Sequence, residues 1–524
     1  MPANAAKNAY HDFTTFDEII NHWATERPNG PAIEQEGRLT NFTELEAVTR
    51  RLIGFFQSRG LVKGDRIAWL GKNSDLHCQL YLAAARMGIV MVPIGWRLAP
   101  PEIAFILSDT GAKLVFAGEA FEQTAKDVIH GLETKPELIG EGAARAALAH
   151  HDAGEFEPAG VDDPILQLYT SGTTGNPKGV QLSNGNILHL RIAGNEAGVD
   201  WNHYEADDCV LFAMPCAHIG GTGLINNAVA NGVRCRVDAE FTPDGVLSAI
   251  EAGATHLFIV PAALQMVVQH PKAAETDFSK LKFLMYGAAP MPLELLKEAV
   301  KTMPNAGFVQ LYGMTETTGT VTALDPEDHT LEGNERMRSA GKAIPGVEAQ
   351  IRGPDNKELP LGEIGEVCIR SPSNTEGYWN LPDATASTID AEGWVHTGDA
   401  AIMDADGYVY IQDRIKDMII TGGENVYPAQ VESAIYGHPA IAEVAVIGIP
   451  SEKWGEEVKA CVVAKPGHDI DPNDVIAYTR ENIAAFKVPK TIDIIPELPR
   501  NASGKILRRQ LRAPYWEGQE RGVA

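Results

Sequence analysis

The stretch that decides the fold reads YTSGTTGNPKGV, from Tyr169 to Val180. It lies between two apolar runs, at 165–168 and 180–182, that are typical of short strands. The turn between them consists mostly of glycine, short hydroxyl side chains and Lys178. Glycine lets backbone N–H groups approach a ligand closely, and such groups together with a lysine bind phosphate. The stretch therefore predicts a polyphosphate-binding loop between two strands.

Two other interpretations of this loop fit it less well. The Walker P-loop requires the pattern G-x-x-x-x-G-K-[ST] at the start of a helix, and the spacing from Gly172 to Lys178 does not match it. A polar surface hairpin with a solvated lysine is the usual role of a glycine-rich loop. Four hydroxyl side chains, three glycines and a Pro-Lys-Gly end within one loop favour phosphate binding over that role.

The size and charge of the chain limit what it can do. Its 524 residues indicate two or more domains, and its 44% hydrophobic and 22% charged residues are typical of a globular protein. The formal net charge of −26 argues against nucleic-acid binding and against attraction to an anionic membrane. Any site for a polyanion must therefore use local positive groups within an overall negative field.

The cysteines and the N-terminus carry no motif of their own. The six cysteines form no C-x-x-C pair and have no histidine at zinc-site spacing, so we expect buried free thiols. The N-terminal segment lacks the basic and apolar regions of a signal peptide, and no apolar run approaches ~18 residues. We therefore expect a cytoplasmic protein with no integral membrane segment.

Helical and strand-like patterns alternate before the loop. Apolar residues recur at helical spacing in 13–25, 42–60, 76–87 and 100–109, and buried strands are expected at 66–70 and 89–93. This alternation is typical of an α/β domain. Residues 119–162 are rich in alanine, glutamate and glycine and are weakly patterned, so we predict a surface segment that leads into the loop.

A second strong motif, QLYGMTE, runs from Gln310 to Glu316. Tyr312 can stack on a base, and Glu316 is a hard oxygen ligand suited to Mg²⁺. A helix N-terminus capped by Thr315 is an alternative interpretation that is compatible with the first.

Three weaker signals occur elsewhere. His218 precedes a Gly-Gly turn, although a lone histidine beside apolar residues is more often a structural core group. The segment 284–290 is a strand that runs into small residues, and α/β proteins bind flat ligands at such strand ends. Asp399 follows a Thr-Gly turn and can accept two hydroxyl groups at once.

Taken in order, these motifs resemble those of the adenylate-forming superfamily, which includes acyl-CoA synthetases, carrier-protein adenylation domains and firefly-type luciferases. The resemblance runs from about Phe13 to the C-terminal arginines and is closest to the fatty-acyl and aryl-acid CoA ligases. It implies an α/β plus α+β fold: a large N-terminal domain of α/β subdomains with a β-barrel-like part, and a small mobile C-terminal α+β lid. We expect the N-terminal domain at 1–412, a hinge at 413–417 and the lid at 418–524.

The resemblance also implies a role for each matching residue. The catalytic groups would be Lys505, Glu316 and Lys178, and Mg²⁺ would bind to Thr170 and Glu316. The residues expected to bind the cofactors ATP and CoA are Thr170, Ser171, Gly172, Thr173, Thr174, Gly175, Lys178, Gly287, Ala288, Ala289, Tyr312, Gly313, Met314, Thr315, Glu316, Asp399, Ile411, Arg414, Lys416, Gly422, Gly423, Glu424 and Lys505. Among them, the turn at Gly422 and Gly423 is expected to contact CoA. The residues expected to line the acyl pocket are His218, Ile219, Gly221, Tyr286, Gly287, Gly313, Thr318 and Gly319.

The implied reaction is ATP-dependent ligation of a carboxylic acid to CoA. The acid would attack Mg·ATP to give acyl-AMP and pyrophosphate, and the lid would then rotate about Lys416 so that the CoA thiolate can form the thioester. Small residues in the expected pocket, and no lysine or arginine among them, favour a medium-to-long fatty, aryl or alicyclic monocarboxylic acid. The sequence leaves the oligomeric state open, a homodimer included.

Three other functions share these motifs. One is an adenylating enzyme that loads a carrier protein, although no carrier domain is visible in the chain. A second is a luciferase-like oxygenase, which shares all of these motifs and can be distinguished only by an activity assay. A non-catalytic nucleotide or acyl sensor usually lacks the glutamate or the final lysine, and both Glu316 and Lys505 are present.

Overall fold

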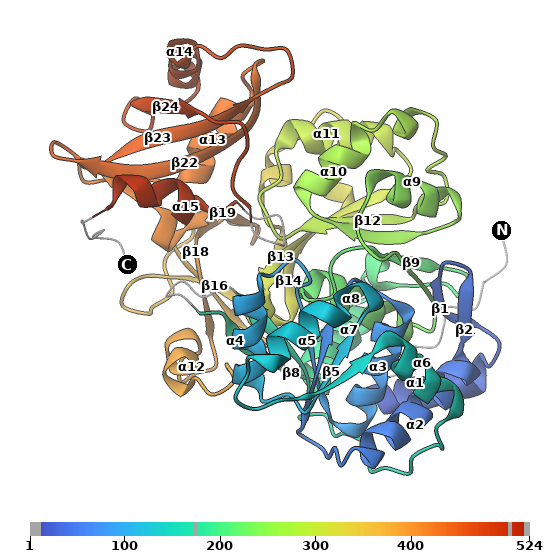
Figure 1. Cartoon of the computed structure of the whole chain (residues 1–524). Helices are drawn as coiled ribbons and strands as arrows, with labels where there is room; N and C mark the ends of the chain where they lie inside the picture. Colours follow the sequence, from blue (N-terminus) through green and yellow to red (C-terminus); the bar gives the residue numbers. More distant parts are fainter. Residues whose placement is uncertain (1–11, 171–175, 501–505, 518–524) are drawn as a thin grey trace.

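The computed structural model describes residues 12–170, 176–500 and 506–517 (Figure 1). The described chain forms four β-sheets with helices packed against them, as a large N-terminal domain and a small C-terminal domain. The C-terminal domain, coloured orange to red, consists of the elements from β20 to α15. The expected architecture of α/β and α+β parts is confirmed, whereas the mobility of the smaller part stays a prediction.

A six-stranded sheet carries the phosphate-loop hairpin at its edge. Its strand order is β6-β5-β3-β4-β7-β8, parallel except for the antiparallel edge strand β8. The strands are β3 (Arg66–Leu70), β4 (Val90–Ile94), β5 (Leu114–Ala117), β6 (Glu137–Gly140), β7 (Pro164–Thr170) and β8 (Lys178–Ser183). Because β7 and β8 are the last two strands, their ends at Thr170 and Lys178 lie at one corner of the sheet.

A nine-stranded sheet brings the base-binding motifs to a common edge. Its order is β15-β14-β13-β12-β11-β9-β10-β1-β2, and the strands from β13 to β1 are parallel. The strands are β1 (Pro31–Gln35), β2 (Arg38–Asn41), β9 (Cys209–Phe212), β10 (Arg234–Val237), β11 (His256–Ile259), β12 (Phe283–Gly287), β13 (Gly307–Met314), β14 (Gly319–Leu324) and β15 (Lys342–Ala343). The carboxyl ends of β12 and β13 therefore lie side by side, where α/β sheets bind ligands.

The two remaining sheets are smaller. The last part of the N-terminal domain is an antiparallel sheet of β16 (Glu348–Arg352), β17 (Gly365–Arg370), β18 (Val395–Met403) and β19 (Val409–Arg414). The C-terminal sheet contains β20 (Ile419–Thr421), β21 (Glu424–Val426), β22 (Ile441–Ser451), β23 (Gly455–Ala464) and β24 (Thr491–Ile494). A 3₁₀ turn, Ile415–Asp417, joins them at the position expected for the hinge.

Helices cover both faces of the large sheets. They are α1 (Phe16–Glu26), α2 (Phe42–Ser58), α3 (Asp75–Met87), α4 (Pro100–Thr110), α5 (Glu122–His130), α6 (Glu141–His150), α7 (Asn184–Ala197), α8 (Ile219–Ala230), α9 (Pro243–Glu251), α10 (Pro261–Val268), α11 (Leu293–Thr302), α12 (Pro382–Thr388), α13 (Pro428–Tyr436), α14 (Pro472–Asn482) and α15 (Arg508–Arg512). Residues of α1, α2, α3 and α8 form one core cluster with residues from both large sheets. The C-terminal domain has its own core, built from β20–β23, α13 and α14.

Local sequence signals set where several helices begin and end. Thr15 caps α1 by accepting a hydrogen bond from the backbone N–H of Glu18, and Ser183 caps α7 in the same way. Gly88 ends α3 in the left-handed conformation that favours glycine. Every residue of α3 is buried, the polar Asp75, His77, Gln79 and Arg86 included, and each fully buried leucine stabilises the fold by about 1.5–3 kcal/mol.

The structure corrects the prediction for residues 119–162. Instead of an unpatterned surface segment, this stretch contains α5, β6 and α6, and β6 extends the parallel sheet beside β5. β6 has only four residues and is partly exposed, so its sequence lacks the long apolar run of a central strand. The alanine-rich α6 buries one narrow face, at Ala144, Ala147 and Leu148, which gives a weak periodic signal.

The expectation of buried free thiols is confirmed. All six cysteines are unpaired and buried: Cys78, Cys209, Cys216, Cys235, Cys368 and Cys461. The first five lie in the N-terminal domain, and Cys461 lies on β23. None of the helices in the described ranges is both long enough and apolar enough to span a membrane.

Candidate active site

The phosphate-loop hairpin ends beside the carboxylate of Glu316. Thr170 and Lys178 face each other across β7 and β8. The Thr170 hydroxyl lies 3.5 Å from a carboxylate oxygen of Glu316, Oε1. Only 5% of Glu316 is exposed. The two expected Mg²⁺ ligands, although 146 positions apart in sequence, are therefore brought together from two different sheets.

A residue that the sequence analysis did not assign completes this group. Tyr378 is buried, and its hydroxyl donates a 2.8 Å hydrogen bond to Oε1 of Glu316. The ammonium of Lys178 lies over the same ring, 4.8 Å from its centre. The backbone around the ring is bound to β8, because Trp379 donates to the carbonyl of Gly179 at 2.8 Å. One buried tyrosine thus links the lysine to the carboxylate.

A second group of side chains surrounds Asp399. The hydroxyl of Tyr312, on β13, donates to Oδ2 of Asp399 at 2.8 Å, and Arg414 lies 3.3 Å from Oδ1. Burial, and to a lesser degree the charge of Asp399, raises the pKa of Tyr312 well above its usual value. The tyrosine therefore stays neutral at physiological pH and donates a hydrogen bond to the carboxylate.

The turn that carries Asp399 is a bulge in β18. Glu366 pairs with Ala400 and Cys368 pairs with His396, so three residues of β18 lie opposite one of β17. Gly398, in this bulge, has a φ of +71°, and its N–H donates to Oε1 of Glu366 at 2.8 Å. Bulges re-aim side chains beside active sites, and this one directs Asp399 toward Tyr312.

The end of β13 approaches the start of β14 unusually closely. A Cβ atom on Gly313 would lie only 1.5 Å from the carbonyl oxygen of Gly319, so glycine is required at position 313. Thr318, just before β14, has a φ of +56°, and Gly319, the first residue of β14, has a φ of +99°. In place of a helix capped by Thr315, the structure has a 3₁₀ turn, Thr315–Thr317, preceded by Met314.

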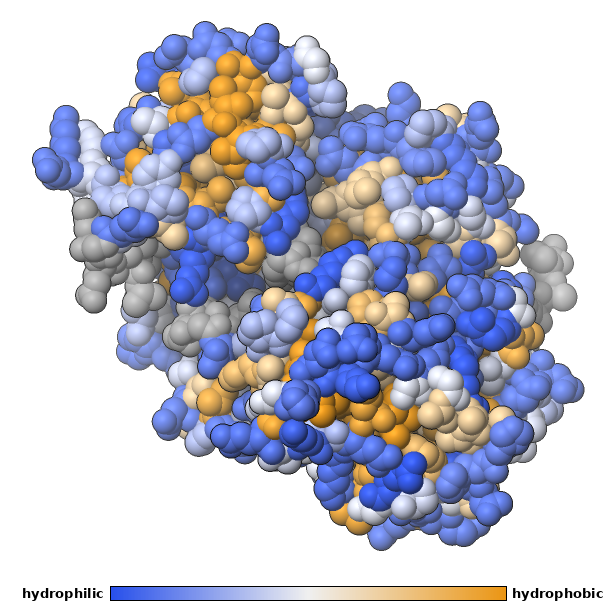
Figure 2. All heavy atoms as spheres, viewed as in Figure 1, coloured by the Kyte–Doolittle hydropathy of each residue, from blue (hydrophilic) through white to orange (hydrophobic). Residues whose placement is uncertain are grey.

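A cleft of about 2260 Å³ lies between the two domains, and Figure 2 shows the surface hollowed there. The expected site residues on its lining are His218, Ile219, Gly221, Tyr286, Ala288, Ala289, Tyr312, Gly313, Met314, Thr315, Asp399, Ile411, Arg414 and Lys416. Burial, and then the charge of Arg414, lowers the pKa of Lys416. The lining includes the apolar side chains Phe241, Phe258, Val260, Met266 and Met291.

Tyr286, on the cleft lining, forms a polar pair with His329 that the sequence analysis did not predict. The hydroxyl of Tyr286 lies 2.9 Å from Nε2 of His329, and Nδ1 of His329 lies 2.9 Å from the carbonyl of Asp325. Because Nδ1 must donate to the carbonyl, Nε2 accepts from the tyrosine. Burial lowers the pKa of His329 and keeps the ring neutral, which fixes this direction.

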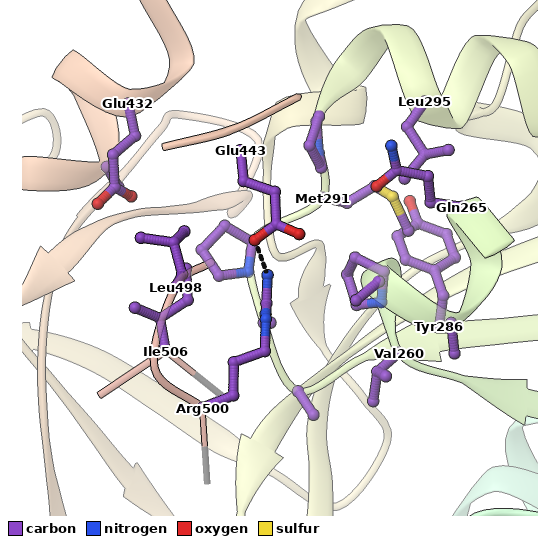
Figure 3. A pocket seen from close by; sticks show the side chains of 18 of the residues that line it. Val260, Gln265, Tyr286, Met291, Leu295, Glu432, Glu443, Leu498, Arg500 and Ile506 are labelled. Carbon is purple, nitrogen blue, oxygen red and sulfur yellow. Dashed lines mark hydrogen bonds and ion pairs between the residues drawn. The ribbon is translucent and has the colours of Figure 1, made fainter. Parts of the chain in front are cut away.

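The C-terminal domain forms the opposite wall of the cleft. Figure 3 shows Leu498, Arg500 and Ile506 facing Tyr286, Val260 and Met291 across the opening. Arg500 binds Glu443 at 2.7 Å and pairs with Ile506 in a β-bridge. Arg500 and Ile506 flank the segment 501–505. Lys505 itself, like Ser171, Gly172, Thr173, Thr174 and Gly175 of the phosphate loop, lies outside the described residues.

The glycine turn expected to contact CoA lies elsewhere. Gly422 and Gly423 form an exposed turn between β20 and β21, followed by Glu424. None of these three is among the described residues that line the cleft. Gly287 also lies behind its lining, where a Cβ atom would be 2.0 Å from the carbonyl of Leu311.

Comparison with known proteins decides the family. Residues 20–379 match the AMP-binding enzyme family, and residues 430–505 match the AMP-binding enzyme C-terminal domain. The chain belongs to the AMP-binding enzyme family. This places it in the adenylate-forming superfamily and confirms the resemblance read from its motifs.

Relatives and solved structures cover nearly the whole AMP-binding enzyme. It is 39% identical to the fatty acid–[acyl-carrier-protein] ligase ScoC of Streptomyces coeruleorubidus, over 97% of this chain and 98% of that protein. It is 38% identical to the long-chain-fatty-acid–CoA ligase FadD13 of Mycobacterium tuberculosis, over 90% and 93%. The crystal structure of ATP-bound MatB from Rhodopseudomonas palustris superposes with a TM-score of 0.86 at 31% identity, over 95% and 98%.

Proposed function

We propose that this AMP-binding enzyme is an AMP-forming acyl-CoA ligase that activates a medium-to-long fatty, aryl or alicyclic monocarboxylic acid. One observation carries the proposal most directly: Thr170, Lys178 and Glu316 lie close together around Tyr378, and Thr315, the residue before Glu316, lines the cleft with Tyr312 and Asp399. These are the groups needed to hold a nucleoside triphosphate by its phosphates and its ribose.

The residues present fit a magnesium ion. The Glu316 carboxylate and the Thr170 hydroxyl supply hard oxygen ligands, and their oxygens are 3.5 Å apart. A bound Mg²⁺ would neutralise charge on the phosphates during transfer. Lys178 would add a point charge to the same phosphates, and Lys505 would add a second one from the C-terminal domain.

The nucleotide would lie with its ribose against Asp399. The carboxylate is already oriented by Tyr312 and Arg414 and can accept from two ribose hydroxyls. The base would then lie against the small residues that follow β12, Ala288 and Ala289, with Tyr312 beside it. This arrangement directs the α-phosphate toward the apolar part of the cleft, where the carboxylate of the acid would attack.

The second half-reaction requires a different position of the C-terminal domain. In the structure, the residues beside Lys505 face the cleft and the Gly422–Gly423 turn does not. We therefore assign this arrangement to acyl-AMP formation. A rotation near Lys416 would exchange the two segments, exclude water from the mixed anhydride and admit the CoA thiol.

A carrier protein is the second candidate acceptor. The observation that favours it is the match to ScoC, which spans 97% of this chain and is named as an acyl-carrier-protein ligase. The choice of acceptor affects only the second half-reaction, so both candidates share the site described above.

The deciding experiment is mass spectrometry of purified enzyme with ATP, Mg²⁺ and a panel of acids, with either CoA or a holo acyl carrier protein. Acyl-CoA and AMP from one class of acid would identify both acid and acceptor. Acyl-AMP without a CoA thioester, together with loading of the carrier protein, would favour the second candidate. Neither product from any acid, despite tight ATP binding, would contradict ligase activity and favour a nucleotide sensor.

Tyr378 provides a sharper test of the phosphate end of the site. The Tyr378→Phe variant keeps the ring under Lys178 but removes the hydrogen bond to Glu316, which is worth about 1.5 kcal/mol or more for a charged acceptor. We expect the Mg²⁺ concentration for half-maximal acid-dependent ATP–pyrophosphate exchange to rise by about tenfold, because the Glu316 carboxylate is no longer held in place. The KM for the acid should not change.

A matched control is available at Tyr408. Its hydroxyl also donates to a carboxylate at 2.8 Å, but that carboxylate belongs to Asp328 and not to Glu316. Tyr408→Phe should therefore leave the Mg²⁺ dependence unchanged. Equal Mg²⁺ curves for Tyr378→Phe and Tyr408→Phe would show that Tyr378 does not position Glu316.

A further inference from the structure

Glu366, Cys368 and His396 place three metal-ligand atoms close together beside the Asp399 turn. Glu366 and Cys368 are two positions apart on β17, and His396 lies directly opposite Cys368 on β18. Nδ1 of His396 is 2.8 Å from Oε2 of Glu366 and 3.5 Å from Sγ of Cys368. All three ligand atoms lie within 4.8 Å of one another. Sequence analysis could not detect this group because the histidine is 28 positions from the cysteine.

The spacing suits a tetrahedral ion. With Zn–S near ~2.3 Å and Zn–N near ~2.0 Å, tetrahedral coordination places a sulfur and a nitrogen ligand roughly 3.5 Å apart. That is the distance between Sγ of Cys368 and Nδ1 of His396. The carboxylate would need to withdraw by a few tenths of an ångström to make room for the ion between it and the ring.

Outer partners orient two of the three ligands. A carboxylate oxygen of Asp390 lies 3.7 Å from Nε2 of His396, on the opposite side of the ring from Nδ1. Arg352 holds that Asp390 oxygen at 3.1 Å. Metal-binding histidines commonly direct their second nitrogen toward a carboxylate in this way. Oε1 of Glu366 accepts from Gly398, so one carboxylate oxygen is anchored and Oε2 faces the histidine.

The site is reachable from solvent. The side chains of Glu366 and His396 are about a quarter exposed, at 23% and 24%, whereas Cys368 is fully buried beneath them. An ion can therefore enter from the carboxylate side and keep water at its fourth position. A thiolate and an imidazole select zinc-like ions over Mg²⁺, which prefers oxygen ligands.

We propose that Glu366, Cys368 and His396 form a binding site for a thiophilic divalent cation such as Zn²⁺, and that its occupation weakens nucleotide binding. Binding forms bonds from the ion to sulfur, nitrogen and oxygen and releases the thiol proton to solvent. The His396 ring changes tautomer: Nδ1 loses the proton that it shares with Glu366, and Nε2 carries a proton toward Asp390. The shift of the Glu366 carboxylate that makes room for the ion strains its hydrogen bond from the Gly398 N–H and so loosens the bulge that orients Asp399. The metal site stands independently of the proposed function, and only its effect on ATP rests on it.

The test uses the full chain without substrates. Equilibrium dialysis with Zn²⁺, and titration with Co²⁺ as a spectroscopic probe, should give one ion per chain and a sulfur-to-cobalt charge-transfer band. Cys368→Ser should abolish the band and weaken Zn²⁺ binding at least tenfold, and His396→Gln should do the same. Cys461→Ser changes a buried thiol in the other domain and should bind as wild type. Excess Mg²⁺ should not displace the ion.

Three results would overturn the proposal or its regulatory part. The site itself is refuted by the absence of a cobalt–thiolate band in folded wild-type protein, or by a band that persists in Cys368→Ser. The regulatory part is refuted if Zn²⁺ binds but leaves the Kd for a non-hydrolysable ATP analogue unchanged in wild type. We expect Zn²⁺ to raise that Kd severalfold in wild type and not in Cys368→Ser. Because Zn²⁺ that binds directly to the nucleotide affects both proteins equally, the comparison of the two removes its contribution. Circular dichroism confirms that each variant is folded.

Discussion

Replacing Glu316 with glutamine is expected to slow acyl-adenylate formation by roughly 10²–10³-fold, the usual cost of losing one electrostatic group at a charged transition state. The substitution keeps the size of the side chain and a carbonyl oxygen for the Tyr378 hydroxyl, so the packing at this buried position is retained. It removes the negative charge of the proposed magnesium ligand. The rate is measured as acid-dependent ATP–pyrophosphate exchange at saturating Mg²⁺.

Nucleotide binding should survive this change better than catalysis. The proposed ribose contact is Asp399, which Tyr312 and Arg414 orient, and no hydrogen bond or ion pair found among the described residues joins these three to Glu316. The control is Glu294→Gln, an exposed glutamate elsewhere on the cleft lining, which should leave the exchange rate within about twofold. If Glu316→Gln retained a third or more of the wild-type rate, the carboxylate would not hold the metal.

Replacing Lys505 with alanine is expected to separate the two half-reactions. Formation of acyl-AMP from acid and ATP should fall by roughly 10²–10³-fold, because the charge that Lys505 would bring to the α-phosphate is lost. Thioester formation from synthetic acyl-AMP and CoA should continue at nearly the wild-type rate, since that step uses the other position of the C-terminal domain. Both rates are measured by rapid quench and mass spectrometry of the same preparation.

The control for this pair of measurements is Lys490→Ala. Lys490 is an exposed lysine of the C-terminal domain that joins the sheet only through its backbone N–H. Neither half-reaction should change in that variant. An equal loss of both half-reactions in Lys505→Ala would instead indicate damage to the domain as a whole and would contradict the alternation between two positions.

Local composition predicted those parts of the site that lie within one continuous segment. Polar groups follow directly after an apolar run in the β7–β8 hairpin, at the strand end near Tyr312 and in the Asp399 turn. A short stretch of sequence therefore predicts both the strand and the polar end proposed to bind a ligand. The same reasoning failed for β6, whose four residues form a partly exposed sheet edge and lack the apolar pattern of a central strand.

Contacts between distant segments could not be read in this way. Tyr378 reaches Glu316 across 62 positions, and its neighbourhood reads only as a surface turn in the sequence. The pairing of Cys368 with His396 depends on the register of β17 against β18, which shifts at the bulge. The register of two strands is set by the whole sheet, so it cannot be predicted from the few residues that the register places side by side.

The distribution of the buried cysteines gives the protein an internal reporter of partial opening. Five thiols are enclosed in the N-terminal domain, and the C-terminal domain encloses one, Cys461. A thiol reagent should therefore leave the native protein unlabelled, because reaction requires exposure of the sulfur. Under mild denaturation, a mass increase of a single label would record unfolding of the C-terminal domain alone, and five further labels would record loss of the rest. Counting labels by mass thus resolves the order in which the two domains melt.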